Sequence, residues 1–90
     1  MPQAVVNPEE LERFAQNLAQ FNAQMRDSMS SLQGQFNALG DTWRDQEQVK
    51  FAQEFQQTMR VLHQFIRVAD DHIPFLRRKA QKARDYLNQR

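Results

Sequence analysis

The 90-residue sequence contains no cysteine and is poor in glycine and proline. Without cysteine, a disulfide, a thiol nucleophile and a cysteine-ligated zinc site are all excluded. Two glycines and three prolines are too few for a β-sandwich or barrel, which needs turn residues about every 8–12 positions. No run of about 18 apolar residues occurs, so no segment is expected to span a bilayer. A single all-α domain over residues 1–90 is the class that fits this length.

The N-terminal segment lacks the features of a secretory signal peptide. It has no basic region, and its only apolar run, Ala4-Val5-Val6, is too short. We therefore expect a protein that is cytoplasmic when made and, if it is exported, one that leaves without a cleavable signal peptide.

Basic and acidic residues nearly balance, at 12 against 11, but the basic ones collect at the C-terminal end. Residues 76–90 hold Arg77, Arg78, Lys79, Lys82, Arg84 and Arg90 against a single acidic residue, Asp85. A basic tail can bind nucleic acid or anionic lipid. Cations are also favourable near a helix C-terminus, where they oppose the negative end of the macrodipole. We favour the second interpretation, because no aromatic cluster accompanies these charges to stack on bases.

The first half of the chain predicts a helix over about residues 8–39. Asn7 is a suitable N-cap, Pro8 fits the first helical position, and Glu10 follows three residues after the cap. Gly40 suits a left-handed C-cap. Apolar residues recur at steps of three, four or seven positions, with Ser28 in step between two of them, which predicts a seam packed against another helix. This seam consists of Leu11, Phe14, Leu18, Phe21, Met25, Leu32 and Leu39.

The second half predicts a turn over about residues 40–45 and a longer helix over about 46–88. Asp41 or Asp45 can cap this helix, and Gln48 follows three residues after Asp45. Pro74 lies inside the pattern without changing its phase, so we expect a kink near Pro74 rather than a second loop. The apolar seam comprises Ala52, Phe55, Met59, Leu62, Ile66, Ala69, Ile73, Leu76, Ala80, Ala83 and Leu87.

The second helix also has another apolar line, formed by Val61, Phe65, Val68 and Phe75. The first helix can cover only one of the two lines, and a lone two-helix hairpin buries little apolar area. We therefore expect a hairpin of two long antiparallel helices that dimerises into a four-helix bundle. The four residues of the second line are predicted to lie in the interface, in a homodimer or a heterodimer.

Trp43 stands alone in the polar turn between the two predicted helices. Together with an Asn-Pro-Glu-Glu start, Leu39 before it, and Phe51 and Phe55 after it, this layout resembles the WXG family, the ESAT-6-like proteins of type VII secretion. The resemblance implies a non-enzymatic hairpin that pairs with itself or a sister hairpin. It also implies that the secretion machinery, including its ATPase, recognises the turn Trp43-Arg44-Asp45. Asp45 stands where the family motif has glycine.

The C-terminal signal of the family is incomplete in this chain. Many exported members, or their partners, carry Tyr-x-x-x-Asp/Glu after the second helix, but here Tyr86 is followed four residues later by Arg90. The resemblance implies that a partner supplies this signal or that recognition differs.

No set of residues points to catalysis, a cofactor, a metal ion or a small-molecule substrate. A glycine-rich phosphate loop is absent from the sequence. His63 and His72 are nine residues apart, so they lie on opposite sides of a helix and cannot share a metal ion within one chain. Asp70 and Asp71 are expected to cap and polarise the second half of the kinked helix.

Two other functions stay open from the sequence. An intracellular coiled-coil scaffold or nucleic-acid-associated protein would use the basic tail to contact phosphates. A type III needle subunit is also a small helical hairpin, but that function predicts a proline-rich turn, which this chain lacks.

Overall fold

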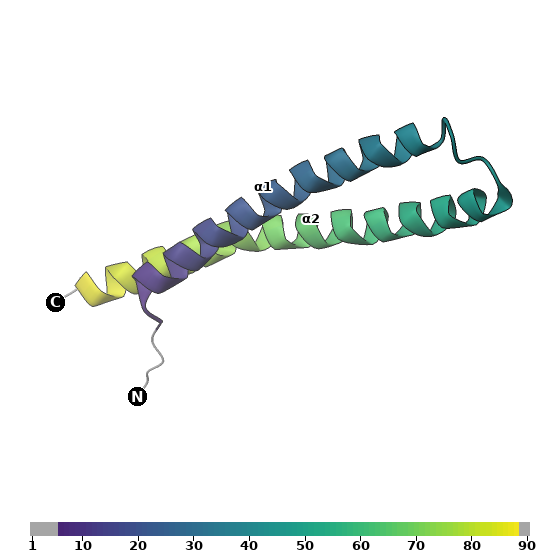
Figure 1. Ribbon diagram of the computed structural model, residues 1–90. Coiled ribbons are helices and arrows are strands. Elements are labelled where there is room, and N and C mark those ends of the chain that lie inside the picture. The colour runs from purple at the N-terminus through teal and green to yellow at the C-terminus, as the bar shows by residue number, and fades with distance from the viewer. Residues whose placement is uncertain (1–5, 89–90) are drawn as a thin grey trace.

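The computed structural model describes residues 6–88, which form a hairpin of two α-helices. Helix α1 spans Pro8–Leu39 and helix α2 spans Gln46–Asn88. The helices run antiparallel, so the start of α1 and the end of α2 lie together at one end of the hairpin, opposite the turn (Figure 1). We refer to that end as the open end. The predicted all-α hairpin is confirmed. Neither helix has a stretch that is long and apolar enough to cross a membrane.

The hairpin is one layer of helices thick. Its principal extents are 69 × 20 × 14 Å, and α1 and α2 pack only on each other. Each helix can therefore bury one stripe of side chains within the chain, and the rest of its surface stays accessible.

Both helices begin at the caps that the sequence predicts. The side-chain Oδ1 of Asn7 accepts a hydrogen bond from the backbone N–H of Glu10 at 3.1 Å. At the second helix, Oδ1 of Asp45 accepts from the N–H of Gln48 at 3.0 Å. Each contact satisfies one of the backbone donors that a helix N-terminus leaves unpaired.

The end of α1 differs from the prediction. Gly40 has φ −61° and ψ −18°, a right-handed conformation, so the expected left-handed C-cap is wrong. Its N–H donates to Asn37 O at 3.2 Å, and the next three amides, up to Trp43, donate to carbonyl oxygens of the last turn of α1. Residues 40–43 thus continue from α1 as right-handed turns instead of ending it with a left-handed residue. No residue of the described chain, glycine included, has a positive φ.

Helix α2 continues through Pro74 without interruption. The proline therefore does not open a second loop, in agreement with the unbroken apolar phase around it. A bend of the helix axis near Pro74 stays a prediction.

The core lies where the two helices face each other. On α2 it follows the predicted seam, with Met59, Ile66, Ala69 and Ala80 buried, although Leu87 at the open end is exposed. On α1 the prediction is partly wrong, because four seam residues are exposed and, beyond the first position Pro8, three residues outside the seam are buried instead. The exposed residues are Phe14, Phe21, Leu32 and Leu39, and the buried ones are Ala15, Asn22 and Met29.

The physical reason is the angular offset between neighbouring residues on a helix. Phe14 and Phe21 each precede a buried residue by one position, which is about 100° around the helix. The apolar stripe of α1 is broad, and its edge rather than its centre faces α2. The two phenylalanines therefore lie beside the seam, on the surface of the hairpin.

Candidate functional site

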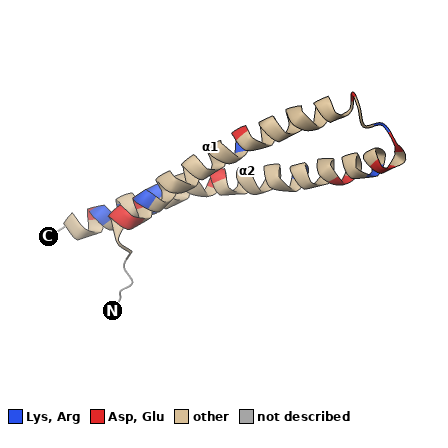
Figure 2. Ribbon diagram, viewed as in Figure 1, with Lys and Arg blue, Asp and Glu red and all other residues tan. Residues whose placement is uncertain are grey.

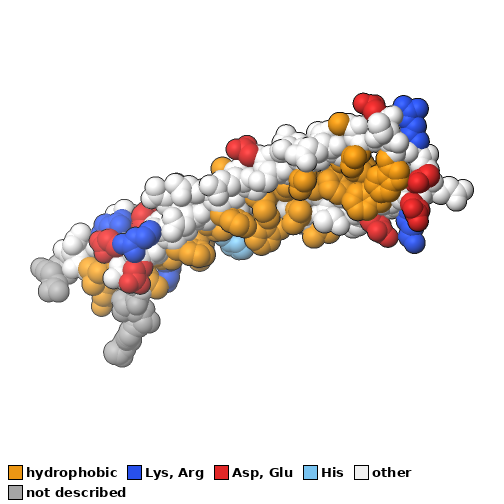
Figure 3. Space-filling model, viewed as in Figure 1, with side chains coloured by type: hydrophobic (Ala, Val, Ile, Leu, Met, Phe, Trp, Pro, Cys, Tyr) orange, Lys and Arg blue, Asp and Glu red, His pale blue; other side chains and the backbone are white. Residues whose placement is uncertain are grey.

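One side of the hairpin carries an uncovered apolar surface, which we call the apolar face. It comprises Phe14, Leu18 and Phe21 on α1 and Val61, Phe65, Val68 and Phe75 on α2. A shallow groove between the helices is lined by Phe14, Leu18, Phe65 and Val68, which places the two halves of the face together. The other members lie seven residues from one of these four and so share their side of the helix. Figure 3 shows a band of hydrophobic side chains along the hairpin.

The apolar face is exposed to a degree that is unusual for a protein without a partner. Phe14 and Val61 are each 57% exposed, Phe75 is 54% exposed and Phe65 is 50% exposed. Contiguous apolar surface of this kind marks a site for another protein or another apolar surface. Helix α1 leaves the line of Val61, Phe65, Val68 and Phe75 uncovered, as the sequence analysis expects, and the role of these residues in an interface stays a prediction.

The opposite side of the hairpin is held by polar contacts. Asn22 lies in the helix–helix seam with no exposed surface, and its Nδ2 donates to Asp70 Oδ1 at 2.8 Å. The guanidinium of Arg26, one turn further along α1, forms an ion pair with Asp70 Oδ2. These three residues are called the seam cluster below. Within the described chain, Asn22 Oδ1 has no hydrogen-bond partner.

The seam cluster holds the pKa of Asp70 below its ordinary value of 3.8. The hydrogen bond from Asn22 is the largest cause, and that from Arg26 follows. The expectation that Asp70 caps and polarises the second half of α2 is therefore wrong, because its carboxylate instead binds Asn22 and Arg26 of α1. The available signal was Asn22 itself, a polar residue at seven-residue spacing between Ala15 and Met29.

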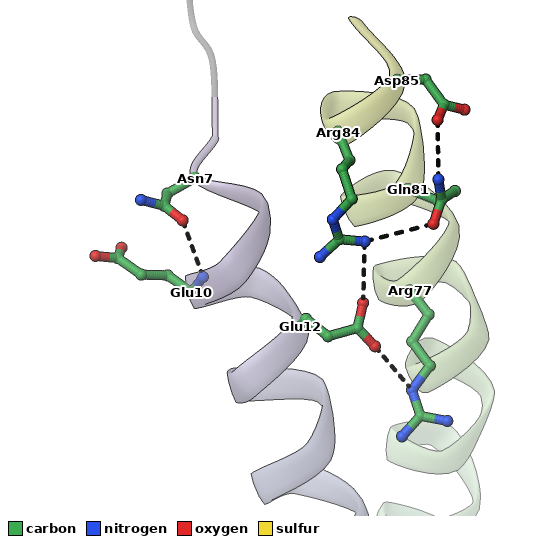
Figure 4. A network of polar contacts seen from close by, with 7 residues as sticks. All are labelled: Asn7, Glu10, Glu12, Arg77, Gln81, Arg84 and Asp85. Carbon is green, nitrogen blue, oxygen red and sulfur yellow. Dashed lines mark hydrogen bonds and ion pairs between the residues drawn. The ribbon is translucent and has the colours of Figure 1, made fainter. Parts of the chain in front are cut away.

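At the open end, the basic tail is partly engaged with α1 (Figure 4). Glu12 lies 3.7 Å from Arg77 and 4.0 Å from Arg84, measured between carboxylate oxygen and guanidinium nitrogen. Arg84 also donates to Gln81, whose amide donates to Asp85 at 2.9 Å. Acidic and basic positions therefore lie side by side at this end (Figure 2).

This arrangement corrects the interpretation of the tail. As far as the structure describes α2, to Asn88, its last turn contains no basic residue, so the expected pairing with the helix macrodipole is wrong. Instead, two arginines of the tail pair with Glu12. Tyr86 is exposed near the end of α2, and Arg90 lies outside the described residues.

The turn is closed by an aromatic cluster. The Trp43 ring is 5.8 Å from that of Phe51, measured between centroids, and Phe51 is 5.9 Å from Phe55. Phe36 on α1 joins the cluster at 4.8 Å from Phe55. Trp43 is partly buried, so the ring packs on α2 and also stays partly accessible to solvent.

The two residues after Trp43 each stabilise one helix end. Arg44 Nε donates to Gly40 O at 3.1 Å, which places a cation at the C-terminus of α1. Asp45 caps α2, and the turn needs no positive φ, so aspartate in place of the family glycine causes no backbone strain here. A role of Trp43, Arg44 and Asp45 in recognition stays a prediction.

The histidines lie on opposite sides of the hairpin, as their spacing predicts. His63 lines a groove with Arg26 and Asp70, and its Nδ1–H donates to Met59 O at 2.9 Å. His72 lines the groove of the apolar face. Within residues 6–88, no three side chains of the kinds that bind metal ions gather at one place.

Comparison with known proteins gives a family and close structural relatives. A family model described as "Proteins of 100 residues with WXG" matches residues 3–86. No curated protein matches the chain significantly. Among solved structures, the secreted protein EsxB from Bacillus anthracis str. Sterne is 32% identical, with a TM-score of 0.79, and the match covers 98% of this chain and 100% of EsxB. A single-substitution variant of EsxB matches with a TM-score of 0.84, 32% identity and coverage of 94% and 99%.

Proposed function

The chain belongs to the WXG100 family, as the resemblance of its turn and helices predicts, and on this basis we propose that it is a non-enzymatic substrate or adaptor of a type VII secretion system. In this proposal the protein is made in the cytoplasm and exported without a cleavable signal peptide, as a pair of hairpins. The relative EsxB is described as a secreted protein, which supports export of this chain.

The observation that carries the proposal is the apolar face. Its large side chains are about half exposed, and fully burying one such side chain stabilises a protein by about 1.5–3 kcal/mol. Covering the face with a second hairpin, from the same or a sister chain, would bury several of these side chains at once and complete a four-helix bundle.

Association is tested by sedimentation of the purified chain and of the Phe65→Asp variant. The wild type should sediment at about twice its chain mass of 10.7 kDa at micromolar concentration. Phe65→Asp should dissociate the pair, because the introduced carboxylate would be buried without a partner. Gln64→Asp is the matched control, since Gln64 is exposed and lies one position off the face. A wild type that stays monomeric and fully helical would contradict pairing.

Export is tested by comparing culture supernatant with lysate, in cells with and without the secretion ATPase. The wild type should reach the supernatant only when the ATPase is present. Trp43→Ala should reduce export while circular dichroism shows that the helices remain, because the partly exposed Trp43 is the proposed recognition feature. Thr42→Ala, at an exposed neighbouring position, should be exported normally. Retention of the wild type in the lysate of an actively secreting cell would refute export.

We propose that the partner hairpin supplies the C-terminal signal or that recognition differs in this protein. Tyr86 is available on the surface of α2, but the acidic residue of the family signal is replaced by Arg90. Adding the signal by Arg90→Glu should therefore increase export if recognition uses this segment. The same export rate in both versions would exclude Tyr86 from the signal.

A further inference from the structure

A second groove runs between the helices on the side of the hairpin opposite the apolar face. Two adjoining hollows there share Arg26 and His63, so they form one continuous depression. At 1.5 Å per residue, the α1 wall from Arg26 to Asn37 is about 16 Å long. We call this depression the polar groove. The lining residues that matter below are Arg26, Gln33, Gly34, Asn37, His63 and Arg67.

The end of the polar groove beside the seam cluster carries an excess of positive charge. Arg26 and Arg67 line it together with a single carboxylate, that of Asp70. Asp70 is already bound by Asn22 and by one nitrogen of Arg26. The guanidinium of Arg67 hydrogen-bonds to Gln64, which is a neutral side chain. Because a guanidinium has five donors and binds a carboxylate strongly, this end of the groove can accept one more carboxylate.

The end of the polar groove nearer the turn carries side-chain amides. Nε2 of Gln33 donates to Oδ1 of Asn37 at 3.1 Å. That bond uses one donor of Gln33 and one acceptor position of Asn37, so the carbonyl oxygen of Gln33 and the amino group of Asn37 can still bond to a ligand. One acceptor and one donor side by side match the N–H and C=O groups of a peptide backbone. These groups are free in an extended peptide, whereas a helix pairs them internally.

Gly34 lies on the wall of the same groove, inside α1. Glycine within a helix is less favourable than alanine, and a Cβ added at Gly34 meets nothing within 4 Å. The packing of α1 on α2 therefore does not require a glycine at this position. A missing Cβ does allow the backbone of a ligand to approach closely.

We propose that the polar groove binds an extended acidic peptide segment of another protein. A carboxylate of the segment binds Arg26 and Arg67, and its backbone lies along Gln33, Gly34 and Asn37. At about 3.3 Å per residue, the groove accommodates about five residues of such a segment. A peptide fits better than a nucleic acid, because no phenylalanine, tyrosine or tryptophan among the described residues lines the groove to stack on bases.

This proposal goes beyond the proposed function and does not depend on it. The polar groove and the apolar face lie on opposite sides of the helix–helix seam. A second hairpin that covers the apolar face therefore leaves the polar groove open, and a single hairpin has the same groove.

The test uses the full chain, labelled for two-dimensional amide NMR, and a blocked eight-residue peptide of alternating glutamate and alanine. The amide signals of Gln33, Gly34 and Asn37 should shift and saturate as this peptide is added. The same peptide with glutamine in place of glutamate should bind about tenfold more weakly or less, because it lacks the carboxylates.

Two variants test the two halves of the site. Arg67→Glu should weaken binding of the glutamate peptide about tenfold or more, because it replaces an attractive charge with a repulsive one. Arg13→Glu is the matched control, since it makes the same charge change at an exposed position away from the groove, and it should change the dissociation constant by less than about threefold.

Gly34→Ala should weaken binding about fivefold or more, because the added methyl group occupies the space of the peptide backbone. The same variant should raise Tm, since alanine is the better helix former. A purely structural role of Gly34 would not lower the affinity while the stability rises, so unchanged affinity in this variant would overturn the close backbone approach.

Other results would overturn the site or its ligand. Shifts confined to residues 77–88 would place the peptide on the basic tail, and the lack of a saturable shift at millimolar peptide would overturn binding altogether. Inorganic phosphate or a single-stranded oligonucleotide that binds the groove as tightly as the peptide would overturn an acidic peptide as the ligand. A protein that is monomeric but binds the peptide as expected would contradict the proposed pairing alone.

Discussion

Replacing Asp70 with alanine should destabilise the protein through the seam cluster. The substitution removes the acceptor of the Asn22 amide and the ion-pair partner of Arg26. Asn22 has no exposed surface and its Oδ1 is already unpaired, so its side chain would have no hydrogen bond at all among the described residues.

The expected magnitude follows from the burial of each partner. A buried polar group without a partner costs about 1–3 kcal/mol. The ion pair adds less than about 1 kcal/mol, because Arg26 and Asp70 are 49% and 35% exposed at their side chains and water screens the charges. For a domain of this size, at about 4–8 °C per kcal/mol, the loss corresponds to a fall in Tm of roughly 4–30 °C.

Thermal melts followed by circular dichroism, at one protein concentration, measure this loss. Asp71→Ala is the matched control, because it makes the same change in helix propensity at an exposed neighbouring position. In an Asn22→Leu background, Asp70→Ala should cost much less, since no buried amide is left without a partner. Equal Tm values for Asp70→Ala and Asp71→Ala would refute the reasoning.

Acid should remove the same contribution. The pKa of Asp70 is lowered in the folded chain, so the stabilisation from its carboxylate is fully present above the ordinary value of 3.8. This stabilisation is lost as the pH falls through the lower pKa of the folded chain. Thermal melts at decreasing pH should therefore show a steeper loss of Tm below about pH 4 for the wild type than for Asp70→Ala, and parallel curves would contradict this. Asp45→Ala should cost about 1 kcal/mol by removing the cap of α2, whereas Asp45→Gly should cost only a few tenths, as urea melts can measure. Equal losses of stability for the two variants would contradict this expected difference between alanine and glycine at the cap position. Gly34→Ala should stabilise the protein by about 0.5–1 kcal/mol, because a Cβ added there inside α1 meets no atom within 4 Å. A Gly34→Ala variant with an unchanged or lower urea midpoint would rule out this gain.

The features that were predictable from the sequence are those set by local chemistry. Asn7 and Asp45 cap their helices through side-chain contacts to residues three positions away, and such contacts can be read directly from the sequence. The phase of the α2 seam was also predictable, because its apolar residues repeat without interruption through Pro74. These local signals predict two long helices joined by a short turn, and such a turn leaves the two helices side by side and antiparallel.

The features that were missed depend on which way α1 is turned about its axis. Phe14 and Ala15 both belong to an apolar stripe, and nothing local to α1 shows which of them faces α2. The contact of Asn22 with Asp70 joins residues 48 positions apart, so it depends on the relative register of the two helices. The conformation of Gly40 was missed for a related reason, since its residue type permits a left-handed turn without requiring one.

The single-layer shape of the hairpin also sets the size of any opening that it can pass through. End on, the described chain measures 20 × 14 Å, so it is a flat rod in cross-section. Joining two hairpins by their apolar faces doubles the thinner dimension from 14 Å to about 28 Å and leaves the wider one at 20 Å, so the direction that was the thinner becomes the wider. A channel that carries the folded pair must therefore be about twice as wide in one direction as a channel that admits one hairpin. Measuring the narrowest channel that the protein crosses would thus reveal whether the pair stays together during passage.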